Sequence, residues 1–261
     1  MVVSTREWER FYTEPNIRFS ALWENYMVKW GIVLQFQHLA QVGFPSKADY
    51  LSGYLRESLD KAKPGGEFEG IIVDTGTFFS DENIERVTKE YALEYINNAL
   101  AVSSAACLVF GHSLLDALLN EYLDMIVDLD SSVFHWYIKD QNVACSAIID
   151  GKHNEALNAK VRKHVGKLKR ESIVVRAETL HQVCRPPSNF FASGLWQYDP
   201  DRLRSIDRLR HDIIHTPRPD APEVNLNIQD DLVFMVWLGM YFVALMNHRF
   251  DLKILPLPPR K

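Results

Sequence analysis

The sequence predicts an all-α fold, and three observations lead to that prediction. Apolar residues recur at intervals of three and four along most of the chain, which is the spacing of amphipathic helices. Prolines interrupt this pattern at Pro186-Pro187 and Pro217, where a helix cannot continue. The 261 residues are 47% hydrophobic and 24% charged, with a formal net charge of −5, as in an ordinary globular protein. This composition excludes a disordered chain, and the acidic total argues against a protein that coats nucleic acid through bulk charge.

The first predicted helix has an aromatic stripe along one side. We interpret this stripe as core or dimer interface rather than as a cofactor site. Its members step by three and four: Phe19, Trp23, Tyr26, Trp30, Val33 and Phe36. Residues 62–80 are the only part that suggests strand, because Pro64-Gly65-Gly66 predicts a turn and Phe68–Val73 suits a short strand. We therefore expect an N-terminal helical extension over residues 1–80, with room for one short β-hairpin near 64–76, and a helical domain over residues 81–255.

Five further helices are predicted after residue 80. The first begins at the cap Ser80-Asp81-Glu82 and runs to about Asp130, with Gly111 marking a close crossing with another helix. The other four predicted helices are Asn154–Glu171, a helix that ends near Val183, a helix that starts at Asp199-Pro200 and ends before Pro217, and Gln229–Arg249.

Several familiar kinds of site are missing from the sequence. It has no Gly-rich phosphate loop, no Gly-x-Ser-x-Gly elbow and no Cys or His pairs at zinc-binding spacing, so we expect no metal and no cofactor. His112 and Asp116 share a helix face, but two residues do not make a metal site, and structural hydrogen bonds are the favoured interpretation. Cys107 lies among apolar residues and is expected in the core.

The location predicted for the chain is the cytoplasm, away from membranes. Three scattered cysteines, Cys107, Cys145 and Cys184, do not form a disulfide framework. The longest apolar stretch, Leu232–Met246, has fifteen residues, which is short of the roughly 20 that span a bilayer. The first residues carry charges where a signal peptide has its apolar run.

Two segments of the chain are basic. Lys152–Arg170 holds seven Lys or Arg residues and one acid, Glu155. On a helix, four of these cations share the face opposite the apolar side: Lys160, Lys163, Lys167 and Arg170. Such a stripe is usually only a solvated face, but a stripe of one sign repels itself and is better suited to facing phosphates.

The second basic segment is the helix that follows Asp199-Pro200. One of its faces carries two arginines and two histidines, namely Arg204, Arg208, His211 and His215. Arg210 lies beside Ile206 and Ile214, so an ideal helix directs its guanidinium toward apolar neighbours. This position is costly unless a carboxylate or a phosphate pairs with the guanidinium.

Two histidines and an arginine suit the cleavage of RNA. The 2′-OH of RNA is a built-in nucleophile, so the reaction needs a base, an acid for the leaving 5′ oxygen, and positive charge at the phosphorane. Histidine serves as base or acid near neutral pH, and arginine binds phosphate through a fork of donors. This chemistry requires no metal.

The run Arg210-His211-Asp212-Ile213-Ile214-His215 resembles the Arg-x4-6-His motif of HEPN domains, a helical family in which many members are metal-independent ribonucleases. In that family a polar residue directly follows the arginine, and His211 matches it. The stretch Gly111–Leu123 resembles the family's long second helix, and together the two resemblances cover roughly residues 81–250. Arg176 and His181 have the same spacing but lack the polar residue, and Arg204 with His211 or Arg208 with His215 match at the longer spacing.

The resemblance implies a homodimer in which two motifs face one cleft and act on RNA. It implies that Arg210 binds the phosphate and stabilises the transition state, that His215 is the acid–base group, and that His211 assists or carries a second proton. Asp116 would hold Arg210, and the RNA backbone would follow two sets of cations: Lys160, Lys163, Lys167 and Arg170, then Arg204 and Arg208. Products would carry a 2′,3′-cyclic phosphate and a 5′-OH. The resemblance also implies a biological role: the chain would act as a toxin or defence effector, controlled by an antitoxin or a regulatory protein.

Other interpretations stay open at this point. The chain could be a non-catalytic HEPN-like module that binds RNA, a nucleotide or a protein partner. It could be a structural dimer that depends on the aromatic helix near Trp23 and Trp30. Arg210 could also be a core ion pair, with His215 as an ordinary helix C-cap.

Overall fold

The computed structural model describes residues 12–61, 81–138, 144–186, 198–215 and 228–255, and over these ranges the prediction of an all-α fold is confirmed. The described residues form helices joined by short turns and contain no strand. The hairpin predicted near residues 64–76 lies outside them.

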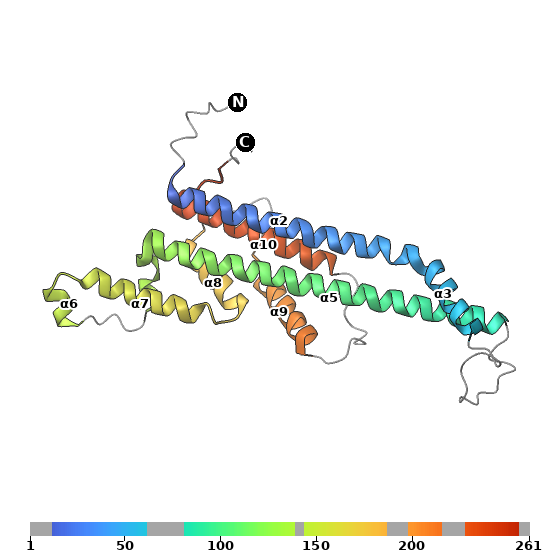
Figure 1. Ribbon diagram of the computed structural model, residues 1–261. Coiled ribbons are helices and arrows are strands. Elements are labelled where there is room, and N and C mark those ends of the chain that lie inside the picture. Colours follow the sequence, from blue (N-terminus) through green and yellow to red (C-terminus); the bar gives the residue numbers. More distant parts are fainter. Residues whose placement is uncertain (1–11, 62–80, 139–143, 187–197, 216–227, 256–261) are drawn as a thin grey trace, which may run out of the picture.

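Three long helices run side by side through the molecule (Figure 1). They are α2 (Glu14–Gly43), α5 (Asp81–Asp130) and α10 (Gln229–Phe250). A 3-10 turn, Pro45–Lys47, joins α2 to α3 (Ala48–Lys61), which packs on the N-terminal part of α5. Helix α5 therefore contacts every layer of the fold.

Helices α7, α8 and α9 pack on α5 away from α2, and the short α6 packs on α7 (Figure 1). After the 3-10 turn Ser131–Tyr137 come α6 (Cys145–Ile149), α7 (His153–Leu168), α8 (Ile173–Cys184) and α9 (Pro200–His215). The ends of the five helices predicted after residue 80 are confirmed to within a few residues, because capping residues and prolines mark most of them in the sequence. The short helix α6 was not predicted, and α2, with 30 residues, is longer than the roughly 20 expected from its apolar stripe. Helix α9 contacts α5 and α8, and its C-terminal end projects away from the body.

The aromatic side chains of α2 pack against glycines on its two neighbours. A Cβ added to Gly111 of α5 would lie 2.5 Å from Cη2 of Trp30, and one added to Gly239 of α10 would collide with the ring of Tyr26. The Tyr26 hydroxyl donates to the carbonyl oxygen of Met235, 3.0 Å away. The close crossing predicted at Gly111 is confirmed, because only a residue without a side chain leaves room for the Trp30 ring.

The predicted aromatic stripe is confirmed except at its end. Phe19, Tyr26 and Trp30 are buried, whereas Phe36 is 51% exposed and Gln37 is buried instead. The Nε2 of Gln37 donates to Ser104 Oγ at 3.1 Å, whereas its Oε1 is buried without a partner among the described residues. The buried residues Trp30, Val33, Gln37 and Ala40 follow alternating steps of three and four, and Phe36 lies outside the face that these steps define.

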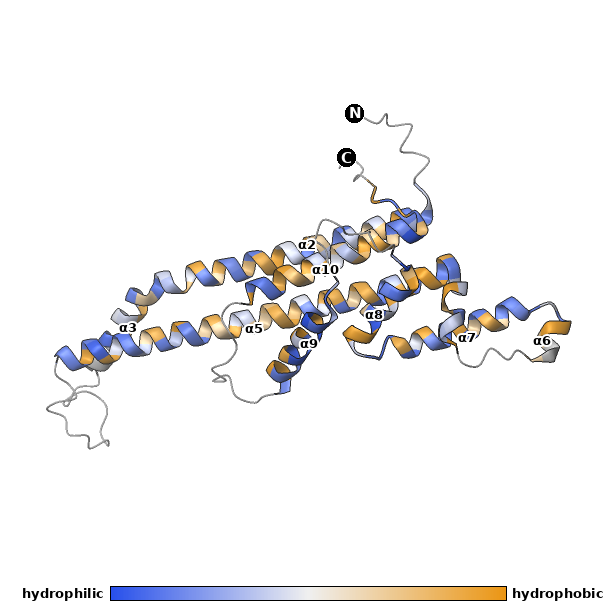
Figure 2. Ribbon diagram, turned by 180° about the vertical axis from the view of Figure 1, so that it is seen from behind, coloured by the Kyte–Doolittle hydropathy of each residue, from blue (hydrophilic) through white to orange (hydrophobic). Residues whose placement is uncertain are grey.

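The outer face of α2 is apolar as well. Its exposed large apolar residues include Val28, Ile32, Phe36, Leu39 and Val42. Figure 2 shows apolar residues along the length of this helix. Trp30 belongs to the buried core and Trp23 packs against it partly buried, so the exposed apolar surface of α2 lies on the other face. A structural dimer that depends on this helix stays a prediction.

One core joins the part of the chain before residue 81 to the part after it. Phe19 and Trp30 of α2 belong to the same buried cluster as Leu119 of α5 and Phe242 of α10. The division of the chain into an N-terminal extension, residues 1–80, and a helical domain, residues 81–255, stays a prediction.

Two helical runs are long and apolar enough to cross a membrane by length and composition alone. They are Asp81–Tyr137 and Gln229–Phe250, and 56% and 50% of their most apolar windows are buried inside the protein. The stretch Leu232–Met246 contributes many buried residues to the core, as predicted. Cys107 and Cys184 are buried free thiols, and burial raises the pKa of Cys184 to about 12. The cytoplasmic location stays a prediction.

Candidate functional site

Helix α9 positions most of the predicted site residues, and its start is built as the sequence indicates. The carboxylate of Asp199 accepts from the backbone N–H groups of Arg202 at 2.9 Å and Asp201 at 3.1 Å, and Pro200 is the first helical residue. Leu203 and Ile206 are buried against the body. The predicted polar face (Arg204, Arg208, His211 and His215) is exposed.

Two histidines lie together on the exposed side of α9. The ring centroids of His211 and His215 are 4.3 Å apart and the rings are tilted by 46°. Arg210 is half-buried beside them, and its Nε is buried without a hydrogen-bond partner among the described residues. Its other neighbours include the charged residues of the cavity described next, so the apolar surroundings predicted for the guanidinium stay a prediction.

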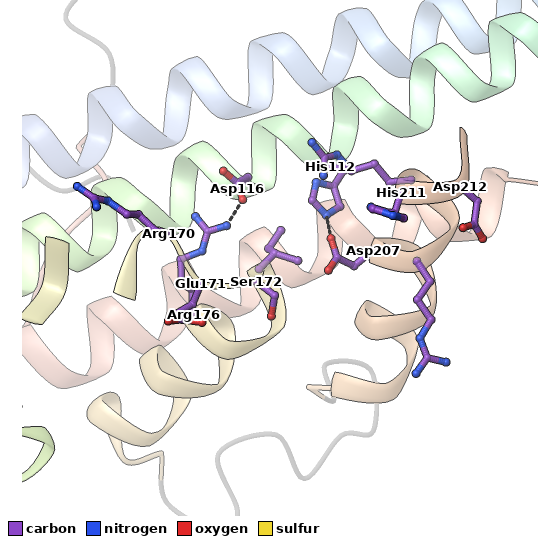
Figure 3. A pocket seen from close by; sticks show the side chains of 12 residues that line it. His112, Asp116, Arg170, Glu171, Ser172, Arg176, Asp207, His211 and Asp212 are labelled. Atoms are coloured by element: carbon purple, nitrogen blue, oxygen red, sulfur yellow. Dashed lines mark hydrogen bonds and ion pairs between the residues drawn. The ribbon is translucent and has the colours of Figure 1, made fainter. Parts of the chain in front are cut away.

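A cavity of about 480 Å³ opens next to His211. Helix α5 forms one wall, the start of α8 forms a second and α9 forms the third (Figure 3). The charged or imidazole-bearing lining residues are His112 and Asp116 from α5; Arg170, Glu171 and Arg176 from the α7–α8 connection and α8; and Asp207, Arg208, Arg210, His211 and Asp212 from α9. Four arginines therefore gather around one cavity.

Two interactions across the helices hold this cavity in shape (Figure 3). His112 Nε2 lies 2.8 Å from Asp207 Oδ1, which ties α5 to α9. The guanidinium of Arg176 pairs with Asp116 and donates to Asn120 Oδ1 at 2.7 Å, which ties α8 to α5. Because the side chain of Arg176 is only 5% exposed, this ion pair is held largely out of water.

The partner expected for Asp116 needs correction. Asp116 was predicted to hold Arg210, but its carboxylate accepts from Arg176. The reason is packing: α8 lies against the turn of α5 that carries Asp116 and Asn120, one helical turn apart on the same face. Asp116 nevertheless lines the same cavity as Arg210.

His112 is buried, and its surroundings act on its charge in opposite directions. Burial lowers the pKa of His112, the neighbouring Asp207 raises it, and the positive charge of Arg210 lowers it again; burial dominates, so the net direction is downward. A neutral imidazole donates from one nitrogen only, and the Nδ1 of His112 is buried without a partner among the described residues. The hydrogen-bond interpretation of His112 and Asp116 is confirmed, with partners on α9 and α8.

The structure brings some of the predicted RNA-binding cations together and leaves others apart. Arg170 and Arg208 line the cavity. Lys163 and Lys167 are exposed on α7, outside the cavity lining, and Lys160 is half-buried there. Elsewhere, Arg204 is paired with Asp201 on its own helix, and His215 lies beside the cavity rather than in its lining.

Several cavity residues were not predicted from the sequence, and Arg176 and Asp207 are the two that make interactions between helices. Arg176 matches the motif's spacing without its polar residue, yet it follows Val174 and Val175 and precedes Ala177, so burying its guanidinium is as costly as burying that of Arg210. Its motif partner His181 serves another purpose: it hydrogen-bonds Tyr241 and stacks on Tyr198, with ring centroids 5.0 Å apart. Asp207 had no signal beyond lying one turn before His211.

Fold and site together define an all-α protein with an arginine-lined cavity beside an exposed pair of imidazoles. Comparisons of the chain with protein-family models, curated proteins and solved structures found no match in any of the three. The geometry itself therefore indicates the chemistry. Guanidinium groups bind phosphate oxygens, and adjacent imidazoles transfer protons.

Proposed function

We propose that this chain is a metal-independent endoribonuclease of the HEPN type. The observation that supports the proposal most is the pairing of His211 and His215, with ring centroids 4.3 Å apart, beside Arg210 and a cavity lined by arginines. Both imidazoles are exposed, so a phosphodiester can reach them from solvent.

The proposed reaction needs only groups on α9 and the RNA itself. One imidazole takes the proton of the 2′-OH, the 2′ oxygen forms a bond to phosphorus, and the bond from phosphorus to the 5′ oxygen breaks. The other imidazole protonates that leaving oxygen. His215 is the acid–base group, His211 is the second proton carrier, and Arg210 stabilises the charge on the phosphorane. The products carry a 2′,3′-cyclic phosphate and a 5′-OH.

The same proposal includes a homodimer in which the two α9 helices meet. Ile214, between the two histidines, is 47% exposed although it is apolar, and the C-terminal end of α9 projects from the body (Figure 1). A contact there would place two histidine pairs on one RNA. We further propose a toxin or defence effector in the cytoplasm, without membrane attachment, restrained by an antitoxin or a regulatory protein.

Cleavage of an end-labelled RNA in the presence of EDTA tests this function. We expect cleavage by the wild-type chain and a loss of about 100- to 10,000-fold in rate for His215→Ala. Because His215 is exposed, the circular dichroism spectrum and the melting temperature should stay unchanged. His38→Ala, which removes an exposed histidine from α2, is the matched control. Undiminished cleavage by the His215→Ala variant would refute the proposed site.

A second candidate is a non-catalytic module that binds RNA or nucleotide. The observation that favours it is that four arginines line the cavity while His215 does not. It predicts RNA binding that weakens steeply with salt, without cleavage, in the wild-type chain.

A further inference from the structure

Another cavity lies at the end of the molecule opposite α6 and α7 (Figure 1). It has a volume of about 390 Å³ and lies where α2 turns into α3, against the N-terminal part of α5; we call it the elbow cavity. Ala99 in its lining lies about 20 Å along the axis of α5 from His112 (13 residues at about 1.5 Å each). The described linings of the two cavities share no residue, so the elbow cavity is separate from the proposed nuclease site.

The turn that forms one wall of the elbow cavity is fixed by hydrogen bonds of its own. Pro45, which has no amide N–H, begins the 3-10 turn directly after α2. The hydroxyl of Ser46 donates to the carbonyl oxygen of Gly43 at 2.7 Å. The backbone N–H of Lys47 donates to the carbonyl oxygen of Phe44 at 3.0 Å. Because these bonds lie within the turn, the protein alone sets the shape of this wall.

The floor of the elbow cavity is apolar. Ile96 of α5 is buried, with 7% of its surface exposed, and three half-buried residues surround it: Phe44, Leu51 and Ala99. These side chains come from the end of α2, from α3 and from α5. The floor therefore offers van der Waals contact to a ligand and no group that would solvate a charge.

The rim of the elbow cavity carries hydrogen-bond donors without acceptors. It is formed by the exposed side chains of Lys47, Tyr50 and Tyr95, which make no ion pair or side-chain hydrogen bond with any residue that the structure describes. The ammonium group of Lys47 is the one charged group in the described lining, which includes no carboxylate. An ammonium group and two phenol hydroxyls can all donate to the same acceptor.

The lysine decides the sign of charge that the rim accepts. Two phenol rings by themselves would suit a cation, because the faces of aromatic rings attract positive charge. The ammonium group of Lys47 repels a cation at this place and attracts an anion. An anion whose charge lies at one end, with an apolar body behind it, therefore matches both the rim and the floor.

We propose that the elbow cavity binds a small apolar acid, a molecule with an aliphatic or aromatic body and one carboxylate. The body lies on the floor around Ile96, and the carboxylate accepts from Lys47 and from the tyrosine hydroxyls. The volume of about 390 Å³ lies within the range of small-molecule sites. Burial of the apolar body supplies most of the affinity, and the exposed charge pair supplies the selectivity for an acid. This binding requires no RNA and no cleavage.

Isothermal titration of the full chain with decanoate, decanol and decyltrimethylammonium tests the proposal. The three probes share one alkyl chain and differ in charge, and each is kept below the concentration at which it forms micelles. We expect saturable binding of decanoate, weaker binding of decanol and the weakest binding of decyltrimethylammonium. Lys47→Gln should weaken decanoate binding about fivefold and leave decanol binding unchanged, because only the charge pair is lost.

Tyr50→Ala should weaken the binding of decanoate and of decanol, each about threefold or more, because part of the apolar contact is lost. At 74% exposure, Tyr50 contributes little to the fold. Two exposed residues outside the lining provide the controls, Lys29→Gln for the charge and Trp136→Ala for the ring, and both should leave every affinity unchanged.

Three results would overturn the proposal of an acid site in the elbow cavity. One is the absence of saturable decanoate binding. Another is decanoate affinity that either Lys47→Gln or Tyr50→Ala leaves unchanged. The third is binding of decanol or decyltrimethylammonium that equals or exceeds that of decanoate, because the rim would then not select a carboxylate.

Discussion

At the scale of single residues, the buried guanidinium of Arg176 has one ion-pair partner, the carboxylate of Asp116. We expect Asp116→Asn, which preserves the shape of the side chain, to lower the free energy of unfolding by about 2 kcal/mol. The loss arises because the guanidinium, 5% exposed, keeps only amide acceptors. The value is below the range for fully buried pairs because the side chain of Asp116 is 34% exposed. Urea unfolding followed by circular dichroism measures it.

Asp128→Asn is the matched control for that measurement. Asp128 accepts from Arg18 at 3.0 Å and from Arg162 at 3.2 Å, but all three side chains are 40% exposed or more. Exposed pairs contribute less than about 1 kcal/mol because water screens them. If both variants lost the same stability, the buried pair would not contribute more than the exposed one.

A second residue-scale prediction concerns pH. Because the pKa of His112 is lowered in the folded chain, the unfolded chain binds more protons as the pH falls below the ordinary histidine pKa, roughly 6.5. The stability from keeping His112 neutral is fully present above about pH 6.5 and is lost as the pH falls toward the lower folded-state pKa. Burial lowers the pKa of His164 and His181 in the same way. The melting temperature should therefore fall between about pH 7.5 and about pH 5.5.

Replacing His112 by Gln isolates its share of this effect. The variant should have a smaller drop in melting temperature over the same interval, since one of the three shifted histidines is gone. A drop as large as that of the wild-type chain would mean that His112 does not contribute to the pH dependence.

At the scale of helices, the crossing of α2 and α5 sets the next prediction. Gly111→Ala should lower the free energy of unfolding by about 1–3 kcal/mol, because the new methyl group overlaps the buried Trp30 ring. Gly31→Ala, one residue from Trp30 but with no atom within 4 Å of the added Cβ, should raise it by up to about 1 kcal/mol through helix propensity. Changes of the same sign in the two variants, measured by urea unfolding, would contradict this account of the crossing.

The helices themselves could be predicted from local signals, but their exact faces could not. Asp199 and Pro200 start α9 through interactions that involve only neighbouring residues, so the sequence contains that information. Gln37 is buried in place of Phe36, and its Nε2 donates to Ser104 Oγ of α5, a partner that lies on another helix. Hydrophobicity alone favours the wrong residue at that position.

At the scale of the whole molecule, the candidate site likewise combines features that local spacing predicts with contacts between helices that it does not predict. Spacing along α9 places His211 and His215 one turn apart, and the structure confirms their proximity. Spacing along α5 places His112 and Asp116 on one face, but their partners, Asp207 and Arg176, come from α9 and α8. Helical periodicity contains no information on partners between helices, so the cavity and the role of Arg176 could not be derived from it.

The last prediction concerns the surface through which two copies of the chain meet. Helices α9 and α2 lie on opposite sides of α5 (Figure 1), and each carries an exposed apolar side chain: Ile214 is 47% exposed and Phe36 is 51% exposed. If the proposed nuclease is a dimer with its histidine pairs facing one another, Ile214→Asp should yield monomers and abolish RNA cleavage, because a desolvated carboxylate opposes association. Phe36→Asp should change neither. Light scattering after size-exclusion chromatography, together with the cleavage assay, measures both. Monomers from Phe36→Asp, with dimers retained by Ile214→Asp, would place the interface on α2 and separate the two histidine pairs, which contradicts the composite site.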